Sequence, residues 1–357
     1  MTILVTEVAP RPGGEVVTRF ADPVNDASWD SRVSRLPGAT FFHGAAWCRV
    51  LKETYGFQPR YVLAEQGDAP CAILPLMEVN NRPKGRRGIS LPFTDECSLL
   101  GGGPADPIVE AAVNEGRVRH WRYLELRGLP AGALHAQTSL SFYRHPLELQ
   151  SNEKEVFGRF DSAVQRALRK AVKSGVTGEV STSFDAVATF YRLHCRTRRK
   201  HGLPPQSFAF FESIHRCIIS PGQGFVVIAR AAGEAIAAAV FFHFGTKAIY
   251  KFGASDERFQ HLRGNNVAMW EAIRWLAGHG FTELDFGRTS LDNEGLRRFK
   301  LGWGTSESRI DYAKYDFAAQ RFVKDRDQTS GWHTHVFRLL PMPVSRCLGT
   351  VLYHRTA

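Results

Sequence analysis

The sequence has no long apolar run, no paired cysteines and no compact motif of a common enzyme class. Its longest apolar run, residues 235–242, is too short to cross a bilayer and predicts a buried strand. The six cysteines are scattered without a C-x-x-C pair, so we expect free thiols in a reducing compartment. The opening residues, MTILVTEVAPRPGGEVV, lack a basic region followed by an apolar run, which predicts no secretory signal and a cytoplasmic location.

The missing catalytic motifs narrow the enzyme classes. No G-x-S-x-G elbow, P-loop, dinucleotide-binding glycine pattern or H-E-x-x-H pair occurs, which argues against serine hydrolases, kinases and zinc enzymes. His194, Cys195 and His201 cluster, but their spacing matches no common metal site. We therefore expect no metal.

The chain is basic and is long enough for two domains. It has 357 residues, of which 43% are hydrophobic and 23% charged, as in ordinary globular proteins. The 46 Lys and Arg outnumber the 35 Asp and Glu, which suggests anionic partners such as phosphorylated ligands, nucleic acid or an acidic membrane surface. Ten of these cations lie between Arg159 and Lys200, against three acidic residues. That segment is either a solvated helix face or an anion-binding surface.

One order of expected elements occurs twice. FFHGAAWCRVLKETYG (41–56) predicts a helix ending at a glycine, and a strand, turn and strand follow over 57–76. FFESIHRC (210–217) and the strand, glycine turn and strand over 224–242 repeat that order. We interpret the repeat as a tandem duplication of one α/β unit, with chance resemblance as the alternative. The predicted domains are 1–150 and 151–317, followed by a tail, 318–357, that packs on the body or forms an amphipathic membrane contact.

The second half resembles the GNAT acyltransferase fold in its order of elements. A strand hairpin, a further strand in TKAIYKFGAS, a loop leading into a helix, and a strand in TELDFG follow one another. In that fold a splayed sheet exposes backbone groups to an acyl donor. The helix N-terminus binds the donor's pyrophosphate through free N–H groups and the helix dipole.

The resemblance becomes specific at YKFGAS and NNVAMWEAIRWLAGHGFTELDFGRTSLDNEGLRRFKLGWGTS. These segments resemble the second domain of Fem-type (FemAB-like) transferases, tandem-GNAT proteins that attach amino acids to peptidoglycan precursors. FFHGAAWCRVLKETYG, AILPL and LPFTDECSLLGGG resemble the first domain. The match runs roughly from residue 41 to 315. It implies an α/β (α+β) fold with two GNAT-like domains, each a mixed, mostly antiparallel sheet flanked by helices.

Two departures leave the acyl donor open. The acetyl-CoA signature Q/R-x-x-G-x-G/A is half present, because RGNNVA has Asn266 where a glycine is wanted. No long helical arm of the kind that inserts into some family members is visible. The donor is therefore acyl-CoA or aminoacyl-tRNA, with no tightly bound cofactor expected. The chain resembles compact relatives encoded in Gram-negative exopolysaccharide and cell-envelope systems.

The resemblance implies one catalytic residue, and the place of Asp285 at the end of a strand suggests a second. When an amine attacks an acyl carbonyl, a fixed cation that stabilises the oxyanion lowers the barrier by roughly 3–4 kcal/mol. Lys300, in the family's FK-x-G-x-G turn, takes this role, with a surface lysine beside a turn as the alternative. Asp285, at the end of a strand, either accepts the amine's proton or pairs with Arg288.

The resemblance also implies residues that bind substrate and donor. Tyr250 contacts donor or acceptor, or packs in the core. The basic stretch T-x-R-R-x-x-G, with Lys200 following the two arginines, is expected to bind acceptor phosphates. Lys52 falls one residue from the position of a family lysine. The full set for substrate is Tyr250, Arg198, Arg199, Lys200, Arg288 and Lys52, and the set for the donor is Arg263, Asn265 and Asn266.

Three hypotheses of function follow. The first is an N-acyltransferase that moves an acyl or aminoacyl group to an amine of an anionic, phosphate-bearing envelope or polysaccharide precursor. The second is a conventional CoA-dependent N-acetyltransferase. The third is a non-catalytic module that binds nucleic acid or envelope polyanions through the basic surface between Arg159 and Lys200.

Overall fold

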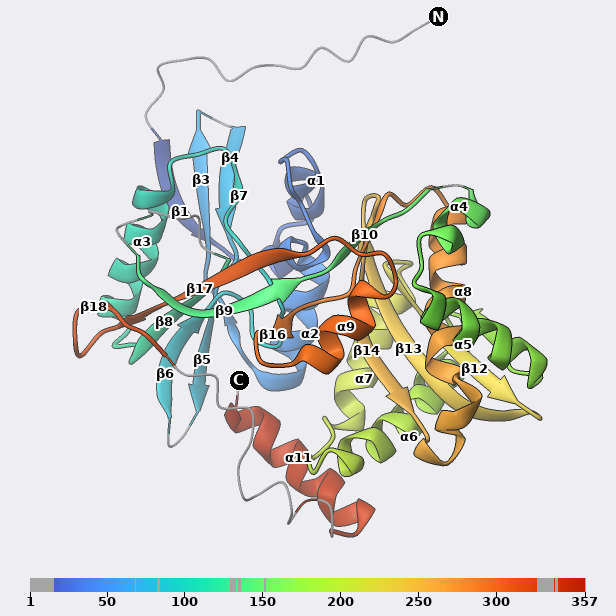
Figure 1. Ribbon diagram of the computed structural model, residues 1–357. Helices are drawn as coiled ribbons and strands as arrows, with labels where there is room; N and C mark the ends of the chain where they lie inside the picture. The colour runs from blue at the N-terminus through green and yellow to red at the C-terminus, as the bar shows by residue number, and fades with distance from the viewer. Residues whose placement is uncertain are drawn as a thin grey trace, which may run out of the picture.

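The computed structural model describes residues 16–67, 69–81, 84–128, 133, 136–150, 152–325, 337 and 340–356. Two α/β halves lie side by side, with the N-terminal half on the left of Figure 1 and the C-terminal half on the right. Long strands in the middle of the view connect them. The helix-then-strands order predicted for both halves is present.

Two sheets form the first half. The smaller has the antiparallel order β1 (Val16–Ala21), β3 (Tyr61–Gln66), β4 (Ala69–Leu74) and β7 (Leu100–Gly101). The larger has the order β16-β9-β17-β8-β6-β5-β2, with β18 paired to β17. Its strands are β2 (Gln58–Pro59), β5 (Met77–Asn81), β6 (Gly85–Ile89), β8 (Tyr123–Arg127), β9 (Thr138–Arg144), β16 (Thr289–Ser290), β17 (Ser308–Asp316) and β18 (Arg321–Phe322). The helices are η1 (Pro23–Asn25), α1 (Trp29–Ser34), η2 (Phe41–His43), α2 (Ala45–Tyr55) and α3 (Ala105–Val118).

One six-stranded sheet forms the second half, in the order β10-β15-β14-β13-β12-β11. The strands are β10 (Pro146–Glu148), β11 (Thr177–Ser181), β12 (Gly224–Ala231), β13 (Glu234–Phe244), β14 (Lys247–Ser255) and β15 (Glu283–Asp285). All neighbours pair antiparallel except β14 and β15, which pair parallel. The helices are α4 (Glu153–Gly158), α5 (Ser162–Lys173), α6 (Phe184–Lys200), α7 (Phe208–Ile214) with η4 (His215–Ile219), η5 (Glu257–Leu262), α8 (Gly264–Gly278), α9 (Glu294–Leu301) and α11 (Met342–Thr356).

Both faces of the second sheet are buried, which explains the unbroken apolar runs of β12 and β13. Alternate side chains point to opposite faces of a strand. Val240 and Phe242 of β13 join the core cluster that includes α6, α7 and α2, whereas Ala239 and Phe241 join the one that includes α5 and α8. The sheet therefore separates two hydrophobic cores. A ligand can approach it at the ends of its strands.

The repeated helices α2 and α7 pack against each other between the halves. The rings of Trp47 and Phe210 have centroids 5.8 Å apart, and those of Tyr55 and Phe210 are 5.6 Å apart. These aromatic contacts bury large apolar side chains where the halves meet. The junction is thus part of a continuous core.

The sheets cross the predicted domain boundary in both directions. β10 precedes residue 150 yet pairs with β15 of the second sheet. β16 and β17 follow residue 151 yet pair with β9 and β8 of the first half. The division at 150 and 317 stays a prediction, and each half contributes strands to the sheet of the other.

Residues 294–301 form a helix where the sequence predicted a loop and a tight turn. The side chain of Asn293 accepts a hydrogen bond from the backbone N–H of Leu296, and Glu294 lies in the first turn. A side-chain cap and an acidic first turn both stabilise a helix start. Lys300 is therefore in the last turn of α9.

The C-terminal helix α11 packs on α6 and the loop after it. Tyr353 contacts Arg198, Arg346 donates to the Tyr191 hydroxyl at 3.2 Å, and Gly349 lies against the backbone of Pro205. In the described part of the chain no helix combines the length and apolar character needed to span a bilayer. All six cysteines are free thiols, as predicted.

Candidate active site at the junction of the halves

The site lies where β14 and β15 separate. The two strands pair only from Lys247 with Glu283 to Ile249 with Asp285. Beyond that point β14 continues to Ser255, while the chain leaves β15 toward β16. Ile249 lines a cleft between the halves, and the next residue, Tyr250, lines an inner cavity. β14 therefore lies between the cleft and the inner cavity and borders both.

The inner cavity has a volume of about 220 Å³ and lies between β13, β14, α8 and α9. Burial raises the pKa of Tyr250 to about 12, so its hydroxyl keeps its proton at neutral pH and remains a hydrogen-bond donor. The Tyr250 hydroxyl lies over Gly253, at a place that any Cβ would occupy. The predicted contact residue therefore borders a cavity, and β14 makes room for its ring with a glycine.

A second cavity, of about 200 Å³, opens at the N-terminus of α8. It shares Asn265 and Phe299 with the inner cavity and is also lined by Arg263, Gly264 and Asn266. The three predicted donor-binding residues thus lie together, in the first turn of α8 and at its cap. The first N–H groups of a helix lack intrahelical acceptors and favour an anion. Their role in donor binding stays a prediction.

Gly264 allows the start of α8 to approach the sheet. A Cβ at this position would lie 2.9 Å from the side chain of Ile236 and 3.1 Å from Cβ of Ala237. Arg263, just before it, has φ +64°, in the left-handed region. The RGNN sequence therefore fits the helix closely against β13 even though it lacks the glycine expected at 266.

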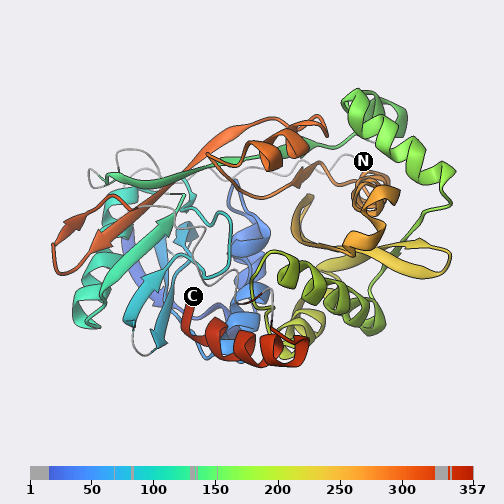
Figure 2. The ribbon, with the colours of Figure 1, turned by 60° about the horizontal axis from the view of Figure 1, so that its bottom comes forward.

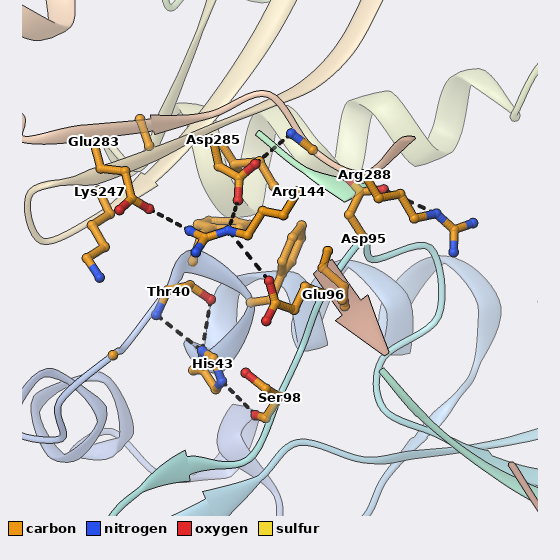
Figure 3. Close-up of a pocket in the computed structure, with 17 residues that line it drawn as sticks. Thr40, His43, Asp95, Glu96, Ser98, Arg144, Lys247, Glu283, Asp285 and Arg288 are labelled. Atoms are coloured by element: carbon orange, nitrogen blue, oxygen red, sulfur yellow. Dashed lines mark hydrogen bonds and ion pairs between the residues drawn. The ribbon is translucent and has the colours of Figure 1, made fainter. Parts of the chain in front are cut away.

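Figure 3 shows the cleft between the halves, which has a volume of about 220 Å³. Arg144, at the end of β9, lies between three carboxylates. Its guanidinium donates to Asp285 at 2.6 Å and to Glu283 at 2.6 Å, and lies 3.6 Å from Glu96. Burial disfavours the Arg144 cation, but the neighbouring carboxylates outweigh burial and raise its pKa. Arg144 is thus a permanent charge that joins β9 to β15.

Of the three carboxylates around Arg144, Glu96 makes the longest ion pair. Arg144 at 3.6 Å is its nearest cation, and that guanidinium already binds Asp285 and Glu283 at shorter distances. Burial raises the pKa of Glu96, and the negative charges of Asp285 and Glu283 add to the rise. A carboxyl with a raised pKa that borders a cavity is suited to accept a proton.

Asp285 accepts two hydrogen bonds that were not predicted from the sequence. Its carboxylate accepts from Arg144 and, at 2.7 Å, from the backbone N–H of Gly287. The expected pairing with Arg288 is wrong. Arg288 instead lies 3.9 Å from Asp95, donates to the Tyr312 hydroxyl at 2.9 Å and stacks on the Phe142 ring. Both Asp285 and Arg288 still line the cleft.

Lys300 lies behind the wall of this cleft and is 4% exposed. Its Nζ donates to the backbone carbonyls of Gly287 at 2.8 Å and Arg288 at 2.9 Å. Burial lowers its pKa to about 8, although Asp95 and Asp285 oppose the shift. An ammonium has three N–H donors. Among the described residues two acceptors are recorded for Lys300, so one donor remains for a ligand or water.

His145 is a second buried group beside Lys300. Neither ring nitrogen has a hydrogen-bond partner among the described residues, and the side chain is fully buried. Burial lowers the pKa of His145, and the positive charge of Lys300 lowers it further. The imidazole is therefore neutral at pH 7 and does not compete with Lys300 as a cation.

His43 fixes the opposite wall of the cleft in Figure 3. Its Nε2–H donates to the Ser98 carbonyl at 3.0 Å, which leaves Nδ1 to accept from the Thr40 backbone N–H at 3.1 Å. Burial lowers the pKa of His43 to about 4, so the ring is neutral at pH 7. This arrangement ties η2 to the loop that carries Asp95 and Glu96.

The remaining predicted substrate residues lie away from the cleft. Lys52 Nζ binds Asp22 at 2.7 Å, and Arg198 donates to the Pro204 carbonyl and to the Tyr353 hydroxyl. Arg199 and Lys200 line a separate basic cavity with Arg196 and Arg258. That cavity shares Ser255 and Asp256 with the cavity at the N-terminus of α8.

Comparison with known proteins identifies the second half and the fold. Residues 158–307 match the family described as "Acetyltransferase (GNAT) domain". A segment of 79 residues is 32% identical to Lipid II:glycine glycyltransferase of Staphylococcus aureus, covering 20% of this chain and 19% of that protein. The chain thus matches about a fifth of the length of this curated relative.

Solved structures share the architecture at low identity. FemX superposes with a TM-score of 0.65 at 14% identity, covering 83% of this chain and 96% of that one. A tandem GNAT protein from the clavulanic acid pathway gives a TM-score of 0.54 at 10% identity, covering 85% and 98%. The C-terminal domain of a putative lysylphosphatidylglycerol synthetase from Agrobacterium fabrum gives 0.55 at 14%, covering 82% and 94%.

These findings confirm the predicted fold class and the predicted resemblance. The chain has the tandem-GNAT fold of FemX, and its second half contains a GNAT acyltransferase domain.

Proposed function

We propose that this Fem-like tandem-GNAT protein is an N-acyltransferase that carries an acyl or aminoacyl group to a primary amine of an anionic cell-envelope or polysaccharide precursor. The donor would occupy the inner cavity and the start of α8, and the amine would enter the cleft between the halves. The observation that carries the proposal is the partition at β14, where Ile249 and Tyr250 border the two spaces.

The cleft favours an ammonium group. Its lining includes four carboxylates, from Asp95, Glu96, Glu283 and Asp285, against the cations Arg144, Lys247 and Arg288. An amine is mostly protonated at neutral pH and must lose a proton before attack. Glu96 is our candidate for accepting it, because of its raised pKa and weak engagement. Asp285 would hold Arg144 and the Gly287 turn in place.

One group behind the wall of the cleft and one at the inner cavity would stabilise the charge that develops during transfer. As the new N–C bond forms, negative charge develops on the donor's carbonyl oxygen, and it collapses when the C–O or C–S bond breaks. We assign the remaining N–H of Lys300 and the protonated Tyr250 hydroxyl to this charge. Burial of Lys300 strengthens the electrostatic effect, because screening by water is reduced.

The anionic character of the acceptor rests on charge outside the cleft. The chain carries a net charge of +11. The basic cavity shares Ser255 and Asp256 with the cavity at the start of α8. Arginine and lysine in such numbers suit phosphate groups. A precursor that carries both phosphates and a free amine would match the positive charge of the chain and the carboxylates of the cleft.

The donor class is tested by labelled transfer. Purified protein would be incubated with radiolabelled acetyl-CoA or a labelled aminoacyl-tRNA, and with amine-bearing nucleotide-linked peptide or sugar acceptors, and products would be resolved by mass. Transfer from either donor to an amine supports the proposal, and transfer from acetyl-CoA to simple amines favours a conventional N-acetyltransferase. Strongly salt-dependent binding of generic nucleic acid, without transfer to any acceptor, would instead favour a non-catalytic binding module.

A further inference from the structure

The C-terminal helix α11 presents an apolar stripe to solvent. Val344, Leu348 and Val351 are 44%, 38% and 44% exposed. Their spacing of four and three residues places them on one side of the helix. Isolated exposed apolar residues are common on proteins, but three in register on one helix form a contact surface.

The stripe is distinct from the side of α11 that packs on the protein. Ser345 and Gly349 are buried, and Gly349 lies against the Pro205 backbone. Tyr353, one turn further on, contacts the ring of Phe93 and the side chain of Arg198. Because this side of α11 packs on the protein, Val344, Leu348 and Val351 face solvent.

A basic cavity adjoins the start of α11. Met342 lines it together with Arg196, Arg199, Lys200 and Arg258, and its volume is about 710 Å³. Asp256 pairs with Arg196 and Arg258, and Glu257 pairs with Lys200 at 3.5 Å. Arg258 also pairs with Glu234 at 3.3 Å, so four cations face three carboxylates and one positive charge remains in excess. Figure 2 shows α11 along the lower edge of the molecule in this view.

We infer that α11 docks the protein on the surface of an anionic lipid bilayer. The stripe enters the boundary between headgroups and acyl chains, and lipid phosphates occupy the basic cavity beside Met342. Charge complementarity selects this partner over an uncharged apolar one. Three partly exposed side chains also bury far less than the roughly 1,200 Å² of a stable protein interface.

Docking would bring the proposed donor path to the lipid surface. The basic cavity shares Ser255 and Asp256 with the cavity at the start of α8, and that cavity shares Asn265 and Phe299 with the inner one. This inference goes beyond the proposed activity, and its test measures binding without turnover.

The test is flotation of the full chain with two kinds of vesicle. One kind contains phosphatidylcholine alone, and the other contains phosphatidylcholine with phosphatidylglycerol. We expect binding to the anionic vesicles that weakens as salt rises, and little binding to the neutral ones. The triple variant Val344→Ser/Leu348→Ser/Val351→Ser should lower the partition coefficient by about a hundredfold.

A matched control removes three exposed apolar side chains elsewhere. Val17→Ser/Val118→Ser/Val172→Ser alters β1, α3 and α5 and should bind vesicles as the wild type does. Far-UV circular dichroism would establish that both triple variants are folded. If the α11 triple variant does not fold, the single Leu348→Asp variant should still reduce binding.

Three outcomes would overturn the inference. The first is unchanged vesicle binding in the folded α11 variants, and the second is equal, salt-independent binding to both vesicle types. The third is a wild-type dimer in sedimentation equilibrium that the stripe variant converts to a monomer, with no vesicle binding. That result would assign the stripe to a second copy of this chain.

Discussion

Replacing Lys300 by methionine separates its contribution to stability from its contribution to catalysis. The change removes two hydrogen bonds from a charged donor, each worth about 1.5–3 kcal/mol, and leaves the Gly287 and Arg288 carbonyls without that donor. It also removes a buried cation. The lowering of the Lys300 pKa from 10.5 to about 8 means that keeping the buried side chain protonated costs about 3 kcal/mol. The two effects oppose each other, so we expect the free energy of unfolding to change by less than about 3 kcal/mol.

The effect on catalysis should be much larger. If Lys300 stabilises the oxyanion, its loss costs roughly 3–4 kcal/mol of the transition state, a decrease in kcat of about 10²- to 10³-fold. The assay is single-turnover transfer from the donor that supports activity, with urea unfolding of the same preparations. Because the pKa of Lys300 is about 8, wild-type kcat should decline as pH rises through 8 and the ammonium is lost.

Lys300→Arg is the matched control for this prediction. It keeps a cation at all accessible pH values, so any remaining activity should lack the decline near pH 8. Full activity of the folded Lys300→Met protein would refute the assigned role. A wild-type kcat that does not change between pH 7 and 10 would refute the part of the reasoning that depends on charge.

Three further changes test the other groups of the site. Glu96→Gln should lower kcat by 10²-fold or more and remove the acidic limb of its pH profile, a result that an unchanged profile would contradict. Gly264→Ala forces a Cβ to 2.9 Å from Ile236, so it should raise the donor KM at least tenfold and cost about 1–3 kcal/mol of stability. Gly278→Ala at the other end of α8 meets no atom within 4 Å and serves as its control in the same kinetic and unfolding measurements. Because the pKa of His43 falls to about 4, its unfolded form binds more protons between pH 4 and 6.5, and urea unfolding should show stability decreasing as pH falls through that window. His43→Gln should flatten this dependence, and an equal slope in that variant would contradict the assignment.

The residues that we propose for donor binding lie close together in the sequence. Tyr250, Arg263 and Asn265 lie within sixteen residues of chain, on one strand and the helix that follows it. The order of elements was therefore enough to predict that they lie near one another, and they line two adjoining cavities that share Asn265. Lys300 was assigned to a turn because the aromatic and glycine residues after it dominate the pattern, whereas the Asn293 cap that starts α9 is a weaker signal.

The acceptor side could not be predicted in this way. Glu96, Arg144 and Glu283 come from three distant segments that meet only when β9 and β15 come together. An ion pair between residues 139 positions apart leaves no periodic trace in a sequence. Lys52 and Arg198 show the converse, since basic residues in family-like positions found partners in Asp22 and Tyr353 instead.

The exchange of strands between the halves limits how the enzyme can move. In Figure 1 the chain passes from β9 into β10 and later returns through β16 and β17, so two separate stretches of backbone bridge the same gap. A pair of units joined by one linker can open like a hinge, but two bridges that end in hydrogen-bonded strands resist rotation and separation. We therefore expect the cleft between the halves to keep a nearly constant width, which would limit the size of a molecule that enters it. Neither half retains its full sheet if it is produced alone, because each sheet contains strands from the other half. We therefore expect the two halves to fold and move together.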